Sequence, residues 1–259
     1  MKGLIDSHFH LLHLKTKNVD ITDVLEQLMI EGFSGGIDIG TALDDLGERT
    51  ILLQPYPSIE LATGLGPWAV EQDNDISTIV DEWISYVEDQ HFDFIGEIGL
   101  DNYWNYGTKE RQKELFVAQM KYATRCKKPI IIHSRDADTE MIQTLNEVDL
   151  PYGGIMHCYS SGWELLETAI EKGLYISFAG PITFKNAKEL HKMVSYVPLH
   201  LLLLETDSPY LAPHPHRGKI NTPLNMRYIY EQAALLREME VEDLIKVIQQ
   251  NFESLCKGH

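Results

Sequence analysis

Short apolar runs alternate along the chain with stretches whose apolar residues recur every three or four positions. The run at 201–204 is four consecutive leucines, which is typical of a strand buried on both faces. The stretch 21–30 carries apolar residues on one helical face. The pattern predicts strands at 4–7, 35–39, 59–63, 92–98, 129–133, 153–157, 174–178 and 201–204. It predicts helices at 21–30, 43–53, 76–87, 109–125, 139–148, 163–171, 187–194, 224–237 and 241–256.

Each predicted strand is followed by a predicted helix, so the strands should pair in parallel. Eight such units in a chain of 259 residues match the size of a (β/α)8 TIM barrel, the fold class we expect. An open, doubly wound sheet is the alternative. Because no linker, low-complexity run or internal repeat interrupts the pattern, we expect a single domain spanning 1–259.

The composition narrows the setting in which the protein works. A net charge of -17 disfavours passive binding to membranes or long nucleic acid, but not an enzyme whose metal ions and local cations contact a nucleic acid. The three cysteines form no CxxC pair, which favours a reducing compartment. The N-terminus meets an acid at Asp6 and shows no signal-peptide core. We therefore expect a cytoplasmic protein without a membrane partner, either a monomer or a weak homo-oligomer.

Imidazoles and carboxylates gather where the predicted strands end. In a barrel these carboxyl ends converge on one mouth. Histidines two positions apart on an extended segment share a face, so the first two can grip one ion. The residues concerned are His8 and His10 after the first strand, Glu97 at the end of the fourth, His133 and His157 at the ends of the fifth and sixth, and Asp207 after the eighth.

A lone histidine at a strand end is more often a hydrogen-bonded core residue than a ligand, but six potential ligands at one rim favour a metal site. Six ligands exceed the need of one ion, so we expect two divalent ions, with Glu97 a candidate bridge. Mixed nitrogen and oxygen donors suit Zn, Mn, Fe or Co, and Mg at an oxygen-rich position. Such a pair lowers the pKa of a shared water, whose proton Asp207 could accept.

Five stretches carry a family resemblance: Asp-Ser-His-Phe-His at 6–10, Gly-Glu-Ile-Gly-Leu-Asp at 96–101, Ile-His-Ser-Arg-Asp-Ala at 132–137, Met-His-Cys-Tyr-Ser at 156–160 and Glu-Thr-Asp-Ser-Pro-Tyr-Leu-Ala-Pro at 205–213. Together with Pro-His-Arg-Gly-Lys at 215–219 they resemble the TatD-type metal-dependent hydrolases of the amidohydrolase barrel superfamily. The resemblance implies a binuclear site with the same six ligands, Glu97 bridging. It also implies phosphodiester hydrolysis on DNA, often as a 3′-to-5′ exonuclease.

The chain departs from this family at three places. Gly66 stands where members commonly have a histidine after the third strand. Two histidines, His214 and His216, flank Pro215 where one is usual. Tyr159 varies a usual phenylalanine. The first and last of these bear on the shape of the substrate and leave the six ligands intact.

Three cations are candidates for binding a phosphate: Arg135, Arg217 and Lys219. Loop aromatics could stack on a base, although loop packing is their default role. They are Trp68, Tyr103 and Trp104. The remaining histidines, at positions 13, 91, 191, 200 and 259, fit no cluster, and we interpret them as ordinary surface or helix residues.

Two other functions are compatible with these residues. One is a small-molecule hydrolase of the same superfamily that acts on an amide, lactone or phosphoester, which the net charge of -17 and the glycine at 66 favour. The other is a metal-binding protein without catalysis, which would need closed coordination with no exchangeable water. A surplus of ligands at an open barrel mouth favours the enzyme.

Overall fold

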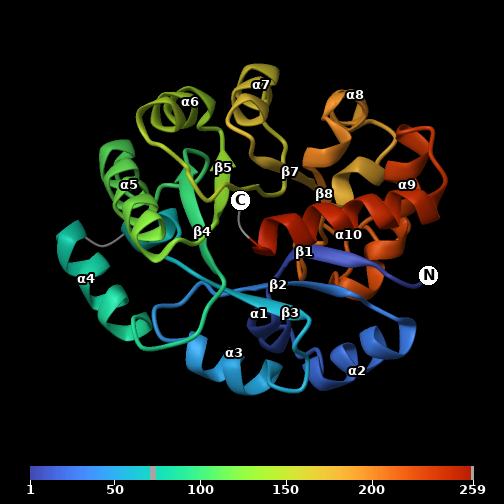
Figure 1. Cartoon of the computed structure of the whole chain (residues 1–259), viewed down its shortest axis with the longest axis horizontal. Helices are drawn as coiled ribbons and strands as arrows, with labels where there is room; N and C mark the ends of the chain where they lie inside the picture. Colours follow the sequence, from blue (N-terminus) through green and yellow to red (C-terminus); the bar gives the residue numbers. More distant parts are fainter. Residues whose placement is uncertain (71–73, 258–259) are drawn as a thin grey trace. The chain divides into compact units, whose positions relative to one another are not determined.

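Strands and helices alternate in a computed structural model of the chain, which describes residues 1–70 and 74–257 (Figure 1). The strands are Ile5–Phe9 (β1), Gly35–Ile39 (β2), Ile59–Thr63 (β3), Phe94–Asp101 (β4), Ile130–Arg135 (β5), Gly154–Met156 (β6), Tyr175–Phe178 (β7) and Leu202–Leu204 (β8). The α-helices are Leu11–Thr16 (α1), Ile21–Glu31 (α2), Leu46–Leu53 (α3), Ile76–Val87 (α4), Lys109–Cys126 (α5), Asp138–Glu147 (α6), Trp163–Glu171 (α7), Lys188–Tyr196 (α8), Met226–Leu236 (α9) and Val241–Lys257 (α10). Short 3-10 helices lie at Pro67–Val70 (η1), Gly180–Thr183 (η2), Leu199–Leu201 (η3) and Pro223–Asn225 (η4).

The eight strands belong to one sheet, in the order β1-β2-β3-β4-β5-β6-β7-β8. The pairs β1–β2, β3–β4, β4–β5, β5–β6 and β7–β8 are parallel. Strictly sequential order with a helix after each strand is the topology of a (β/α)8 TIM barrel, so the predicted fold class is confirmed. A doubly wound sheet would reverse its strand order midway, and this one does not.

Contacts along the chain divide it into two compact units. The first comprises Met1–Asp38, Cys158–Ser160 and Ile176–Ser254, and the second Ile39–His157, Ser161–Tyr175 and Leu255–His259. The single domain over 1–259 stays a prediction.

In the first unit, β1 lies against the segment that follows β8. The backbone of Phe9 pairs with that of Ser208 in an isolated parallel bridge. Asp6, fully buried on β1, accepts hydrogen bonds from the Thr206 amide at 2.8 Å and the Thr206 hydroxyl at 2.6 Å. The Thr206 hydroxyl in turn accepts from the Ser208 amide at 3.2 Å. This network fixes the turn after β8 to the first strand.

In the second unit, two buried glutamines of helix α5 bond to backbone groups, one at the end of β4 and one in the segment after β3. The Gln112 side chain accepts from the Asp101 amide at 2.8 Å and donates to its carbonyl at 2.9 Å. Gln119 makes the same pair of bonds to Leu65, at 2.7 and 2.8 Å. Because a buried backbone polar group is costly when unpaired, these amides stabilise strand and loop segments that lack a ladder partner there.

The predicted strand ends at Glu97 and His133 were wrong. β4 continues to Asp101 and β5 to Arg135, so both residues lie within strands. The extension depends on Gly99, where φ is +149° and an added Cβ would lie 2.0 Å from the His133 carbonyl oxygen. Glycine breaks the apolar run that the prediction used, yet it allows the two strands to approach.

Helix α1 was not predicted either. Its six residues begin directly after His10 and are too short to show a helical period. Longer helices begin at side chains that cap them: Asp20 accepts from the amides of Thr22 and Asp23, and Asp75 and Thr108 act in the same way for α4 and α5. Within the described residues, no helix is both long enough and apolar enough to cross a membrane.

A first prediction concerns the hydroxyl that joins β1 to the turn after β8. Replacement Thr206→Val keeps the shape but removes two buried hydrogen bonds, the one from the hydroxyl to Asp6 Oδ2 and the one that the hydroxyl accepts from the Ser208 amide. We expect the free energy of unfolding to fall by about 1–3 kcal/mol, measured by urea denaturation. Thr206→Ser keeps the hydroxyl and should cost about 1 kcal/mol or less. Equal stability of the two variants would contradict this role.

A second prediction concerns Glu60 on β3. Burial, followed by the neighbouring charge and hydrogen bond of Asp93, raises the pKa of Glu60 from 4.5 to about 7, and Lys128 opposes the shift. The folded state therefore holds a proton that the unfolded chain has lost, and stability falls as pH rises through about 7. Glu60→Gln stays neutral, so we expect it to exceed the wild type at pH 8.5 by about 1–2 kcal/mol after allowance for solvent screening.

The measurement is urea denaturation of both proteins at pH 5.5 and pH 8.5. If the difference in stability between the wild type and Glu60→Gln is the same at both pH values, Glu60 is ionised at both of them.

Candidate metal centre

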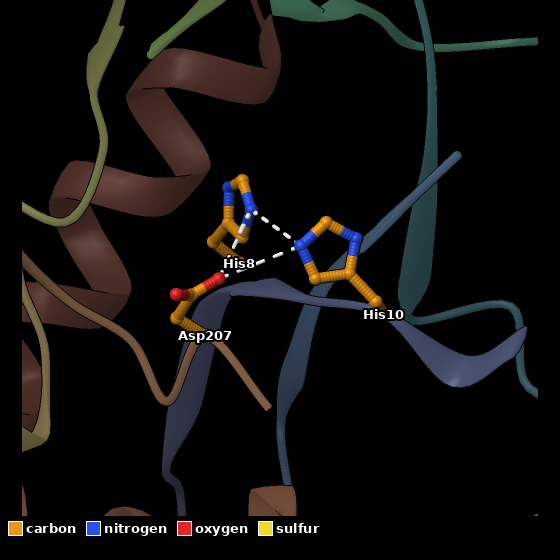
Figure 2. A group of neighbouring side chains, drawn as sticks. All are labelled: His8, His10 and Asp207. Atoms are coloured by element: carbon orange, nitrogen blue, oxygen red, sulfur yellow. Dashed lines mark hydrogen bonds and ion pairs between the residues drawn. The ribbon is translucent and has the colours of Figure 1, made fainter. Parts of the chain in front are cut away.

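Three ligand atoms converge in the first unit. The Nε2 atoms of His8 and His10 lie 3.2 Å apart, and Asp207 Oδ1 lies 3.6 Å from the first and 3.4 Å from the second. Figure 2 shows the three side chains pointing toward one another, with dashed lines joining the two rings and the Asp207 carboxylate in a triangle. Both imidazoles are buried, and Asp207 is 13% exposed. This group has the composition and spacing of a metal-binding cluster.

The backbone holds these three residues in register. The Asp207 amide donates to the His8 carbonyl at 2.9 Å, and the His10 amide donates to the Ser208 carbonyl at 2.9 Å. Asp207 has a φ of +53°, a left-handed conformation in which aspartate is tolerated more readily than most residues. The turn therefore directs the carboxylate toward the same side as the two rings of β1.

A second group of ligand atoms converges in the other unit. Glu97 Oε1 lies 2.7 Å from His133 Nδ1 and 2.9 Å from His157 Nε2, and the two ring nitrogens are 3.3 Å apart. Glu97 and His157 are buried, and the His133 side chain is 18% exposed. The His157 amide donates to the Ile132 carbonyl at 3.1 Å, which anchors the residue directly after β6.

The outer nitrogen of His133 faces another carboxylate, which the sequence analysis did not single out. His133 Nε2 lies 3.1 Å from Asp101 Oδ2. Burial disfavours the charged ring, but the hydrogen bonds of Asp101 and Glu97 outweigh it and raise the pKa of His133. A carboxylate on one ring nitrogen fixes the tautomer and leaves the other nitrogen free to bind a metal. Asp101 lies four residues after Glu97, and that spacing was the available signal.

The first group has the spacing of ligands around one divalent cation, and the second is slightly tighter. An ion about 2.0–2.2 Å from each nitrogen or oxygen ligand separates those ligands by roughly 3–3.6 Å. The separations here are 3.2–3.6 Å in the first unit and 2.7–3.3 Å in the second. Two imidazole nitrogens facing each other at 3.2 Å cannot both carry a proton, and a cation satisfies both. Each unit thus brings together three of the six candidate ligands predicted from the sequence.

His13 lies on helix α1, as its interpretation as a surface or helix residue allowed, but it does not stand apart from the candidate ligands. Its ring stacks on that of His10 at 4.8 Å with an interplanar angle of 20°. Its Nδ1 lies 3.1 Å from the hydroxyl of Tyr210. His13 follows His10 by three residues, and the two rings meet because α1 begins at Leu11 and turns the chain back by one helical turn. That helix was not predicted. His259 lies outside the described residues.

The glycine that departs from the family pattern is covered by an aromatic ring. A Cβ added at Gly66 would lie 2.3 Å from two carbons of the Trp68 indole. That indole approaches His133 edge-on, at 6.3 Å between ring centroids, and its Nε1 donates to the Thr41 carbonyl at 3.4 Å. Trp68 therefore fills the space of the missing imidazole beside a candidate ligand.

The three cations expected to bind a phosphate occupy different surroundings. Arg135 is the last residue of β5, and its guanidinium lies 3.9 Å from the centroid of the Tyr103 ring. Arg217 lies 4.6 Å from the Phe184 ring, in the segment after β8. Lys219 follows in the same exposed segment. The structure thus places Arg135 in the second unit, and Arg217 and Lys219 in the first.

Comparison with known proteins gives consistent matches over the whole chain. Residues 5–257 match the family model described as TatD related DNase. The uncharacterized metal-dependent hydrolase YabD of Bacillus subtilis is 34% identical, over 98% of this chain and 99% of that protein. The 3'-5' ssDNA/RNA exonuclease TatD of Salmonella typhimurium is 28% identical, over 91% and 92%. The structure of YJJV, a TatD homolog from Escherichia coli, superimposes with a TM-score of 0.87 at 26% identity and covers 98% of this chain and 97% of that one.

More distant structures share the fold alone, among them the organophosphorus hydrolase of Deinococcus radiodurans, with a TM-score of 0.64 at 13% identity. The match of the family model from β1 to α10 agrees with the order in which the candidate ligands occur along the strands. The chain belongs to the TatD family of metal-dependent hydrolases.

Proposed function

We propose that this enzyme hydrolyses phosphodiester bonds in DNA, as a 3′-to-5′ exonuclease that uses two divalent ions. The observation that carries the proposal is the pair of ligand groups, each combining imidazole nitrogens with a carboxylate oxygen at metal-binding spacing. The name of the Salmonella relative, an exonuclease on single-stranded DNA and RNA, supports the choice of substrate. Mixed nitrogen and oxygen donors suit Zn, Mn, Fe or Co, with Mg possible.

The side chains have separate tasks in this proposal. A bound divalent ion supplies a water of lowered pKa and polarises a phosphoryl oxygen. His8, His10 and Asp207 would hold one ion, and Asp207 would accept the proton released by the water. His133 and His157 would hold the other, with Asp101 fixing the tautomer of His133. The family resemblance adds the proposal that Glu97 is shared between the two ions.

Charge segregation favours a phosphate-bearing substrate. The segments 179–188 and 208–230 include η2, η4 and the first residues of α8 and α9. They contain five lysine and arginine residues and no aspartate or glutamate, in a chain of net charge -17. The two loops pack together, because the His214 amide donates to the Thr183 hydroxyl at 2.8 Å and Arg217 lies over Phe184. A local basic surface beside Asp207 attracts an anionic backbone despite the repulsive overall field. Its cations are Lys185, Lys188, Arg217, Lys219 and Arg227.

A small-molecule phosphoester, lactone or amide hydrolase is the second candidate. The indole of Trp68 covers Gly66 and narrows the surroundings of His133, and this favours a compact substrate. Under this alternative, such compounds would be hydrolysed with a higher kcat/KM than any oligonucleotide.

The metal assignment predicts that metal content and activity are lost together. We expect about two divalent ions per chain by elemental analysis, and hydrolysis of a single-stranded oligonucleotide that disappears in chelator and returns with Mn or Mg. Asp207→Asn should lower kcat at least a hundredfold, because it removes both a ligand and the proton acceptor. Glu97→Ala should lose both ions. Two ions retained in that variant would remove the shared-carboxylate assignment.

The basic loops predict a separate effect on binding. Arg217→Gln and Lys219→Gln should each raise KM for an oligonucleotide about threefold to tenfold and flatten its dependence on salt, because each removes a phosphate contact. Lys246→Gln is the matched control, since Lys246 is exposed on α10 and pairs with Asp243 at 2.8 Å. Identical KM values for all three variants and the wild type would show that the loops do not touch the substrate.

A further inference from the structure

We propose that Tyr103, Trp104 and Arg135 form a platform on which an unpaired base of single-stranded nucleic acid stacks. The proposal rests on the proposed function and adds to it the part of the substrate that the second unit recognises. In a duplex both faces of each internal base are covered by its neighbours, so a stacking platform selects single strands or frayed ends.

The three side chains form one exposed surface. Tyr103 and Trp104 are 55% and 52% exposed, although large aromatic side chains are usually buried. Their rings meet edge to face at 4.9 Å. The Arg135 guanidinium lies 3.9 Å from the Tyr103 centroid and 5.7 Å from that of Trp104. Aromatic faces with a stacked guanidinium bind bases through their π surfaces, with little dependence on base identity.

The platform is held by the same carboxylate that orients a candidate ligand. Asp101 Oδ1 accepts from the amides of Tyr103 at 2.9 Å and Trp104 at 3.0 Å, while its Oδ2 faces His133 Nε2 at 3.1 Å. The buried Gln112 fixes both backbone groups of Asp101. The aromatic pair therefore directly follows the rigid end of β4. A base stacked there would lie beside Asp101, the carboxylate that contacts His133.

The surrounding charges favour a base over a bare phosphate. Within the described residues, Arg135 has no carboxylate partner within 4 Å, so its charge is available to a ligand. Acidic residues follow it closely at Asp136, Asp138 and Glu140. Of these, Glu140 is paired with Lys109. A surface that carries both positive and negative side chains attracts a phosphate only weakly. Stacking of a base on neutral rings does not depend on these charges.

The test compares a fluorescent oligo(dT) with an abasic oligomer of the same length, which keeps the phosphates and lacks the bases. Binding is measured by fluorescence anisotropy in chelator, so that no hydrolysis interferes. We expect the wild type to bind oligo(dT) about tenfold more tightly. Tyr103→Ala and Trp104→Ala should each weaken oligo(dT) binding about tenfold and leave the abasic oligomer unchanged. Trp104→Phe should restore most of the difference, because it restores a ring.

Tyr196→Ala is the matched control, since Tyr196 is 54% exposed at the end of α8 and should bind both oligomers like the wild type. Thermal unfolding of each variant checks that the fold is kept. The platform is overturned if the wild type does not prefer oligo(dT), including the case in which neither oligomer binds, or if the alanine variants keep the preference. It is also overturned if sedimentation shows that the two rings join copies of the chain instead.

The same experiment separates this proposal from the function on which it rests. Base-dependent binding without hydrolysis of any phosphodiester would overturn the proposed nuclease activity and leave the platform in place. Hydrolysis of oligo(dT) and the abasic oligomer with equal KM would overturn the platform and leave the proposed nuclease activity in place.

Discussion

Two backbone hydrogen bonds between β1 and the turn after β8 determine how the first ligand group forms. The Asp207 amide donates to the His8 carbonyl, and the His10 amide donates to the Ser208 carbonyl. These two bonds hold the Asp207 carboxylate next to both histidine rings. Buried Asp6 and Thr206 hold the turn from beneath. The imidazoles and the carboxylate are thus placed by main-chain pairing between the first and last strands, with little left to side-chain flexibility.

The second unit reaches a similar result by different means. There the ligands lie on or directly after neighbouring strands, and the network extends outward through Asp101 to α5 and to the loop that carries Tyr103. One carboxylate accepts from a ligand ring and from two loop amides. Its low pKa, which the hydrogen bond from His133 and those from the loop amides maintain against burial, keeps it a hydrogen-bond acceptor for all of them.

The sequence predicted the fold well, because eight apolar runs and the helical periods between them are properties of single segments. It also singled out the six candidate ligands, since imidazoles and acids near successive strand ends can be read directly, and their role as ligands stays a prediction. It missed what depends on contacts between segments. The full length of β4 was missed because Gly99 interrupts its apolar run. The stacking of His13 on His10 was missed because α1 is too short to show a helical period. The link from Asp101 to His133 requires a strand register, which no local pattern contains.

The glycine at 66 and the indole of Trp68 share one volume, and this constrains how the chain can change over time. A side chain cannot be introduced at 66 while the indole stays, because its Cβ would already overlap the ring. A histidine at 66 therefore requires the indole to turn away or a smaller side chain at 68. The two positions are expected to change together, so a paired substitution explores this part of the surface in a way that a single substitution at 66 does not.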